Sequence, residues 1–203
     1  MAVQTIPWWA SEALWKKIAI WVTAVMLVVL LALTIDSLRQ IAAGSTARVP
    51  AYSVINQRIY YRLDRDRGHS VPVIGEEAPL FGTRLSEADA AALVTLGKLT
   101  VQAKNCMNCH TLLGNGAYYA PDLTKAWLDP AWAHESVREE LMLAFLMDPT
   151  SNARTYGTGR RMPNLGITEE EARGVIAFLK WMAAIDTNGF PAAFPSITQA
   201  DDP

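Results

Sequence analysis

Cys106 and Cys109 are the only cysteines of the chain, and they belong to one C-x-x-C-H motif that ends at His110. This spacing suits covalent attachment of a haem. Two thiols three positions apart can each add to a vinyl group of one porphyrin, and the adjacent imidazole is then placed beneath the iron. We therefore expect one covalent haem c, held by Cys106 and Cys109, with His110 as the proximal iron ligand.

Two other chemistries use similar residues. A thioredoxin-like redox pair also has the C-x-x-C spacing but normally occurs in a βαβ context, whereas this segment follows a predicted helix. A zinc site would need further ligands, and the only other histidines are His69 and His134. The motif favours haem attachment over both.

The second axial ligand of the iron must come from elsewhere in the chain. The candidates are Met142, Met147, Met162, Met182, His69 and His134. Three of the methionines fall in predicted helical stripes, where methionine usually fills core space. Met162 lies instead in an Arg- and Gly-rich loop and is followed by Pro163, which stiffens the approach to the haem. We predict Met162 as the distal ligand, with His134 as the alternative; methionine ligation leaves no open site, so the haem should transfer electrons rather than bind substrate.

Three helical patterns position these residues. A capping pattern at Ser86 precedes an apolar stripe that ends at Ala103, an amphipathic stretch covers residues 135–147, and a second capping pattern at Thr168 precedes a stripe through Met182. Residues 37–85 are punctuated by proline and glycine, which indicates a loop-rich connector with one small hairpin, from strands near 58–63 and 70–74. The predicted fold is all-α.

An uncharged apolar stretch lies near the N-terminus, from Ile18 to Ile35. Eighteen helical residues span about 27 Å, close to the hydrocarbon thickness of a bilayer. The stretch is apolar on every face, unlike a core helix of a small domain, and is longer than the core of a signal peptide. Tryptophans crowd one end, as in an interfacial belt: Trp8, Trp9, Trp15 and Trp21. The pattern predicts a single membrane anchor.

Charge adds two limits. The formal net charge is −2, which argues against a nucleic acid partner. Lys16 and Lys17 before the anchor balance Arg39 and Arg48 after it, so the positive-inside rule does not orient the chain. Because haem c is attached on the outer side of the bacterial inner membrane, we expect the N-terminus in the cytoplasm and the haem motif in the periplasm.

From residue 86 onward the chain resembles a class I cytochrome c. Gly97 stands where that fold's first helix crosses its C-terminal helix, which residues 176–180 resemble. Pro121 matches the proline whose carbonyl accepts a hydrogen bond from the haem-ligating histidine, which fixes the imidazole. Together with the apolar stretch and the haem motif, this resemblance predicts a cytoplasmic tail 1–17, a transmembrane anchor 18–36, a periplasmic connector 37–85, a cytochrome c domain 86–191 and a C-terminal tail 192–203.

A narrower resemblance covers about residues 96–191. The run 106–123, with its Thr-Leu-Leu-Gly-Asn-Gly-Ala-Tyr-Tyr segment, and the run 178–188 are similar to the cytochrome c subunit of bacterial nitric oxide reductases. Asn115 and Gly189 depart from that pattern, in which glutamate and aspartate are usual. The resemblance implies that the Gly116 carbonyl and Tyr118 contribute to a calcium ion at the interface with the catalytic subunit.

The same resemblance implies a function. The chain would be the electron-transfer subunit of the reductase, accepting electrons from a soluble periplasmic donor, a cytochrome c or a cupredoxin. It would pass them to haem b in a large polytopic catalytic subunit that converts 2 NO to N₂O and water, and it would carry no catalytic site for NO itself. The alternative is a free-standing, membrane-anchored cytochrome c that shuttles electrons between respiratory complexes.

Overall fold

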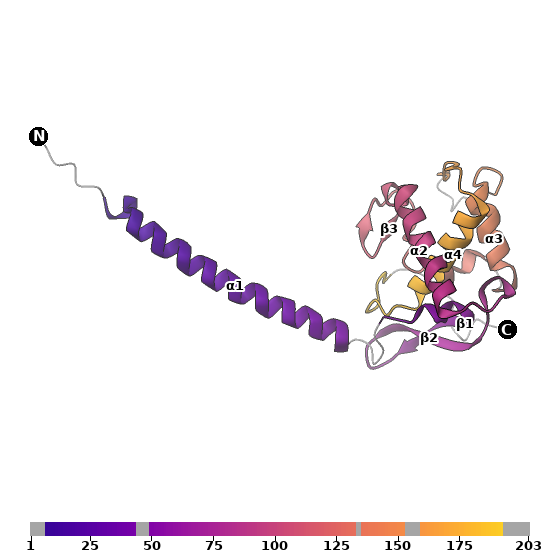
Figure 1. Ribbon diagram of the computed structural model, residues 1–203, viewed down its shortest axis with the longest axis horizontal. Helices are drawn as coiled ribbons and strands as arrows, with labels where there is room; N and C mark the ends of the chain where they lie inside the picture. Colours follow the sequence, from indigo (N-terminus) through magenta and orange to yellow (C-terminus); the bar gives the residue numbers. More distant parts are fainter. Residues whose placement is uncertain (1–6, 44–48, 133–134, 153–158, 193–203) are drawn as a thin grey trace, which may run out of the picture. The chain divides into compact units, whose positions relative to one another are not determined.

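The computed structural model describes residues 7–43, 49–132, 135–152 and 159–192 of the chain. The chain separates into two compact units, residues 1–48 and residues 49–203. The first unit contains one long helix, preceded by the short 3₁₀ turn η1 (Trp8–Ala10), and the second contains the remaining elements (Figure 1). The C-x-x-C-H motif therefore lies entirely in the second unit.

Helix α1 (Glu12–Ala43) contains the apolar stretch and extends beyond it at both ends. Its part from Glu12 to Arg39 is long and apolar enough to cross a membrane, and among the described residues it is the only such helix. No residue in the most apolar part of this helix is buried against the rest of the protein, which suits a helix that contacts lipid. The hydroxyl of Thr34 donates to the carbonyl of Leu30 at 2.8 Å, so this polar group is satisfied without water.

The three predicted helices are present in the second unit. They are α2 (Glu87–Ala103), α3 (Glu135–Met147) and α4 (Glu169–Ala183). Ser86 caps α2 by accepting from the backbone N–H of Asp89, and Thr168 forms a reciprocal capping box with Glu171 at the start of α4. The local signals at these two positions therefore predicted both helix starts correctly.

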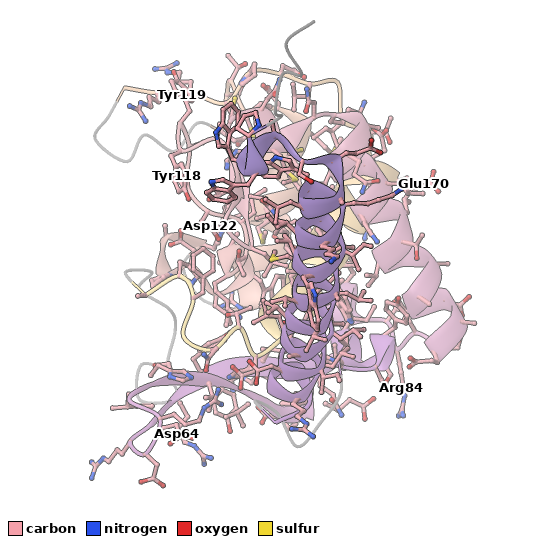
Figure 2. The ribbon with its side chains drawn as sticks, turned by 90° about the vertical axis from the view of Figure 1, so that its left-hand side faces the viewer. Asp64, Arg84, Tyr118, Tyr119, Asp122 and Glu170 are labelled. Atoms are coloured by element: carbon pink, nitrogen blue, oxygen red, sulfur yellow. The ribbon has the colours of Figure 1, made fainter. Side chains whose placement is uncertain are left out.

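The all-α prediction is incomplete, because two small antiparallel sheets accompany the helices. Strands β1 (Gln57–Asp64) and β2 (His69–Glu77) form the predicted hairpin, with Asp64 at its turn (Figure 2), and β3 (Thr111–Leu112) pairs with β4 (Asn115–Gly116). Short 3₁₀ turns complete the unit: η2 (Tyr52–Asn56), η3 (Leu80–Gly82), η4 (Cys106–Asn108), η5 (Ala126–Leu128) and η6 (Pro130–Trp132).

Residues 49–85, predicted as part of a separate connector, share a core with the helices. Val54, Ile55, Ile59, Tyr61 and Leu80 are buried in the same cluster as the apolar face of α4. The hydroxyl of Tyr61 donates to the carbonyl of Ala183 at 3.2 Å, and the buried Lys180 ammonium donates to the carbonyl of Ala78 at 2.9 Å. The structure therefore places the unit boundary after residue 48 instead of after residue 85. The partners lie more than 100 positions apart, so local patterns could not reveal them.

Helices α2 and α4 pack directly against each other in the centre of the unit (Figure 1). They meet at Gly97 and Gly174, where a Cβ added to Gly97 would lie 1.9 Å from the Gly174 carbonyl oxygen. Only a residue without a side chain permits this approach, which agrees with the crossing that the cytochrome c resemblance implied at Gly97. Because α2 ends immediately before the motif, this contact sets where the cysteines emerge.

Candidate functional site

The motif begins where α2 ends. Asn105 adopts a left-handed backbone conformation, with φ of 53°, which turns the chain out of the helix. The next residues form η4, and the backbone N–H groups of Cys109 and His110 both donate to the carbonyl of Cys106, at 3.2 and 3.0 Å. Both thiols are half-buried and free, and burial raises the pKa of Cys106. The two side chains are thus available as unpaired thiols on one tight turn.

His110 has a fixed ring orientation. Its Nδ1 lies 2.7 Å from the carbonyl oxygen of Pro121, and since a carbonyl only accepts, Nδ1 carries the proton. Nε2 is then the nitrogen with a lone pair for a metal. Burial lowers the pKa of His110, opposed in part by the Pro121 carbonyl and the charge of Asp122, so the ring stays neutral at physiological pH. The contact that the resemblance implied for Pro121 is present.

Pro121 is itself held by a network that sequence reasoning missed. The Asp122 carboxylate accepts from the hydroxyl of Thr111 at 2.6 Å and from the backbone N–H of Thr124 at 2.7 Å, and Leu123 N–H donates to the Thr111 carbonyl at 2.8 Å. These bonds tie the Pro121 segment to the residue after His110. A Thr directly after the motif and an Asp directly after the proline were the available signal.

The loop between the motif and Pro121 folds back over the motif backbone. Ala117 N–H donates to the carbonyl of Met107 at 3.0 Å, and Ala120 N–H donates to the carbonyl of Cys109 at 2.8 Å. Gly116 has φ of 117°, and an added Cβ would lie 2.1 Å from the His110 carbonyl oxygen, so no side chain fits there. Tyr118 projects outward and is 81% exposed, and Figure 2 shows it on the same side of the unit as Tyr119 and Asp122.

The candidates for the distal ligand separate by environment. Met142 and Met182 are buried in the hydrophobic core, and Met147 is exposed on α3. His69 Nδ1 lies 3.0 Å from the carbonyl oxygen of Arg67, in the β1–β2 turn. Met162 is half-buried in the loop before α4, and His134 lies outside the described residues.

A buried lysine, Lys125, is a second feature that the sequence did not indicate. Lys125 is buried, donates to the carbonyl of Ile185 at 2.8 Å and lies 4.8 Å from the centre of the Tyr61 ring. Burial lowers the pKa of Lys125 to about 8, partly offset by the carboxylates of Asp186 and Asp122. This lysine joins the segment after Pro121 to the end of α4 and to the hairpin, and so links the site to the rest of the unit.

The residues present fit a covalently attached haem. Two free thiols stand at the required spacing, and the neighbouring imidazole keeps a coordinating nitrogen. Gly116 lets the following loop pack against the motif backbone without a side-chain clash. Within the described ranges, no cluster of three or more His, Cys, Asp or Glu side chains offers a competing metal site.

The fold and this motif define a c-type cytochrome. A family model described as cytochrome c matches residues 94–183, from the middle of α2 to the end of α4, and indicates a covalently attached haem c. Proteins named as the C subunit of nitric oxide reductase are also similar. The one from Stutzerimonas stutzeri is 34% identical over 112 residues, which are 55% of this chain and 73% of the relative. The one from Paracoccus denitrificans is 34% identical over 70% of its length and 53% of this chain. The one from Cereibacter sphaeroides is 39% identical over 65% of its length and 48% of this chain. The chain belongs to this family of nitric oxide reductase C subunits.

Proposed function

We propose that this chain is the electron-entry subunit of a membrane-bound nitric oxide reductase. It accepts single electrons from a soluble periplasmic donor, a cytochrome c or a cupredoxin, and passes them to haem b in a large polytopic catalytic subunit. The reduction 2 NO + 2 e⁻ + 2 H⁺ → N₂O + H₂O takes place in that partner. The observation that carries the proposal is the His110–Pro121 hydrogen bond beside two free thiols, in a chain of this family.

The residues of this chain have distinct roles in the proposal. Cys106 and Cys109 would attach the porphyrin through thioether bonds, and His110 would offer Nε2 to the iron while Pro121 holds its ring in place. Met162 would supply the second iron ligand, a thioether. When bound, the haem provides a one-electron Fe(III)/Fe(II) couple, and a His/Met ligand pair raises its reduction potential. With His110 and Met162 both assigned to the iron, this chain would hold no catalytic site for NO.

The location follows from the same chemistry. Helix α1 crosses the inner membrane once, with residues 1–17 in the cytoplasm and the second unit in the periplasm, where c-type haem is attached. A protease added to right-side-out spheroplasts should remove the haem-bearing unit, whereas the same protease should leave it intact if the opposite orientation is correct.

The calcium role is part of the proposal. The Gly116 carbonyl and the exposed Tyr118 supply two oxygen ligands, and the catalytic subunit supplies the others, since Ca²⁺ takes about six to eight. Chelation of calcium in the purified complex should slow electron transfer between the two subunits, and added Ca²⁺ should restore it. Metal analysis should first show that no calcium is left in the complex. If the rate of electron transfer is then unchanged, the calcium role is excluded.

Purification in mild detergent tests the whole proposal. A tag on this chain should recover a polytopic subunit that contains non-covalent b haem, and the complex should consume NO when a reduced donor is supplied. Recovery of the chain alone, with its haem c and no b haem, would instead support the free-standing electron shuttle.

A further inference from the structure

The loop that carries Met162 is fastened on its N-terminal side by Arg160. The Arg160 guanidinium donates to the carbonyl oxygen of Tyr119 at 2.5 Å and lies 4.6 Å from the centre of the Tyr119 ring. A guanidinium can form a hydrogen bond and stack on an aromatic ring at the same time. Tyr119 lies nine residues after His110, the last residue of the haem motif. This contact therefore joins the loop before α4 to the loop that covers the motif.

The same loop is fastened on its C-terminal side by Lys104. The Lys104 ammonium donates to the carbonyl of Gly166 at 3.0 Å and forms an ion pair with Glu171 at 3.3 Å. Lys104 directly follows the last residue of α2 and stands two positions ahead of Cys106. It therefore connects the end of α2, where the cysteines emerge, to the stretch that leads into α4.

The segment between these two contacts is short and locally ordered. The side chain of Asn164 accepts from the backbone N–H of Gly166 at 2.8 Å, and Ile167 is buried. Arg161 lies between Arg160 and Met162 and is exposed. Within the described part of the chain, only Arg160 of the two adjacent arginines is hydrogen-bonded to the motif loop. Sequence alone does not distinguish them.

We propose that Arg160 and Lys104 are positioning residues that hold the Met162 segment at its two ends and so set how readily another ligand displaces the methionine from the haem iron. The inference rests on the proposed ligation by Met162. A thioether is a weak, neutral ligand, so its occupancy depends on how closely the chain confines it. Without these contacts, the loop would lose conformational entropy when the iron–sulfur bond forms. Each contact to a backbone carbonyl restricts the loop in advance, so less entropy is lost at that step. Both cations thereby favour the methionine-bound state.

Displacement of the methionine by added imidazole measures this directly. The full chain, purified with its haem in detergent and oxidised, is titrated with imidazole while the long-wavelength sulfur–iron charge-transfer band is followed. Arg160→Leu and Lys104→Met should each raise the apparent imidazole affinity about tenfold, as expected for loss of a hydrogen bond from a charged donor. The reduction potential of each variant should also fall, because the methionine is held less firmly.

Two matched controls lie beside the proposed residues. Arg161→Leu removes a neighbouring arginine from the same loop, and Lys98→Met removes an exposed lysine from α2, the helix that ends just before Lys104. Both variants should keep the imidazole affinity of the native chain. Arg160→Lys retains the charge but lacks the planar guanidinium, and its affinity should lie between those of the native chain and Arg160→Leu. If Lys104→Met does not yield folded holoprotein, the Arg160 series decides alone.

The outcomes separate this inference from the proposed function. If the native chain shows the charge-transfer band but Arg160→Leu and Lys104→Met titrate like their controls, the positioning role is wrong and the ligation by Met162 stands. If the native chain lacks the band, Met162 is not the ligand and both ideas fail on that point. A selective increase in imidazole affinity for the two proposed variants supports the inference.

Discussion

Replacing Gly97 by alanine should loosen the crossing of α2 and α4 that positions the haem motif. The added Cβ would lie 1.9 Å from the Gly174 carbonyl oxygen, 2.3 Å from its carbonyl carbon and 2.8 Å from the backbone nitrogen of Val175. Carbon contacts are favourable at about 3.5–4.0 Å, so the helices must separate by about 1.5 Å or more. All three obstacles are backbone atoms of α4, so no side-chain rotation can relieve the clash.

The expected loss of stability is about 3 kcal/mol. Overpacking usually costs about 1–3 kcal/mol and more when backbone must move, whereas the better helix propensity of alanine returns about 1 kcal/mol at most. For a unit of this size, 1 kcal/mol corresponds to about 2–4 °C, so the melting temperature should fall by about 10 °C. Thermal unfolding of the haem-loaded chain, followed by circular dichroism, measures this.

The neighbouring exposed residue provides the control. Lys98→Ala changes the same helix on its outer face and should shift the melting temperature by less than about 2 °C. If Gly97→Ala melts within that range as well, the two helices do not approach as closely as described, and the reasoning about how α2 aims the motif is refuted.

Three further predictions concern the haem, the buried lysine and the donor. Met162→Ala should abolish the sulfur–iron charge-transfer band and lower the reduction potential while haem stays covalently attached. The controls Met142→Leu and Met182→Leu should keep the band, and loss of the band in a control alone would refute the assignment. Because the folded-state pKa of Lys125 is lowered to about 8, the unfolded chain binds more protons than the folded chain above that pH. In denaturant titrations of ferrous protein, the free energy of unfolding should therefore rise with pH between about pH 8 and 10 relative to Lys125→Met. Parallel curves of unfolding free energy against pH would contradict this. Residues 86–203 hold fourteen acidic and nine basic side chains, a net charge of −5. In stopped-flow measurements, reduction of the haem by a basic donor should therefore slow as the salt concentration rises. A salt-independent rate would count against electrostatic docking.

Local chemical patterns predicted the parts of the fold that depend on near neighbours. Ser86 and Thr168 begin α2 and α4 because a capping hydroxyl needs only a backbone N–H three residues away. The hairpin near residues 58–74 followed from strand patterns broken by glycine and proline. The assignment of the same segment to a separate connector was wrong, since Tyr61 and Ala78 find their partners on α4.

The sequence by itself determined the chemistry of the site. Cys106, Cys109 and His110 are adjacent in the chain, so their spacing alone indicates covalent haem, and an apolar run of membrane-spanning length needs no tertiary partner to be recognised. The tertiary structure decided what surrounds that chemistry: the Thr111–Asp122 network behind Pro121, the burial of Lys125, and the choice of Arg160 over Arg161 as the arginine that reaches the motif loop. These features depend on distances between segments that are remote in sequence, and two arginines side by side in a loop are equivalent until folding brings a carbonyl and a ring within reach of only one of them.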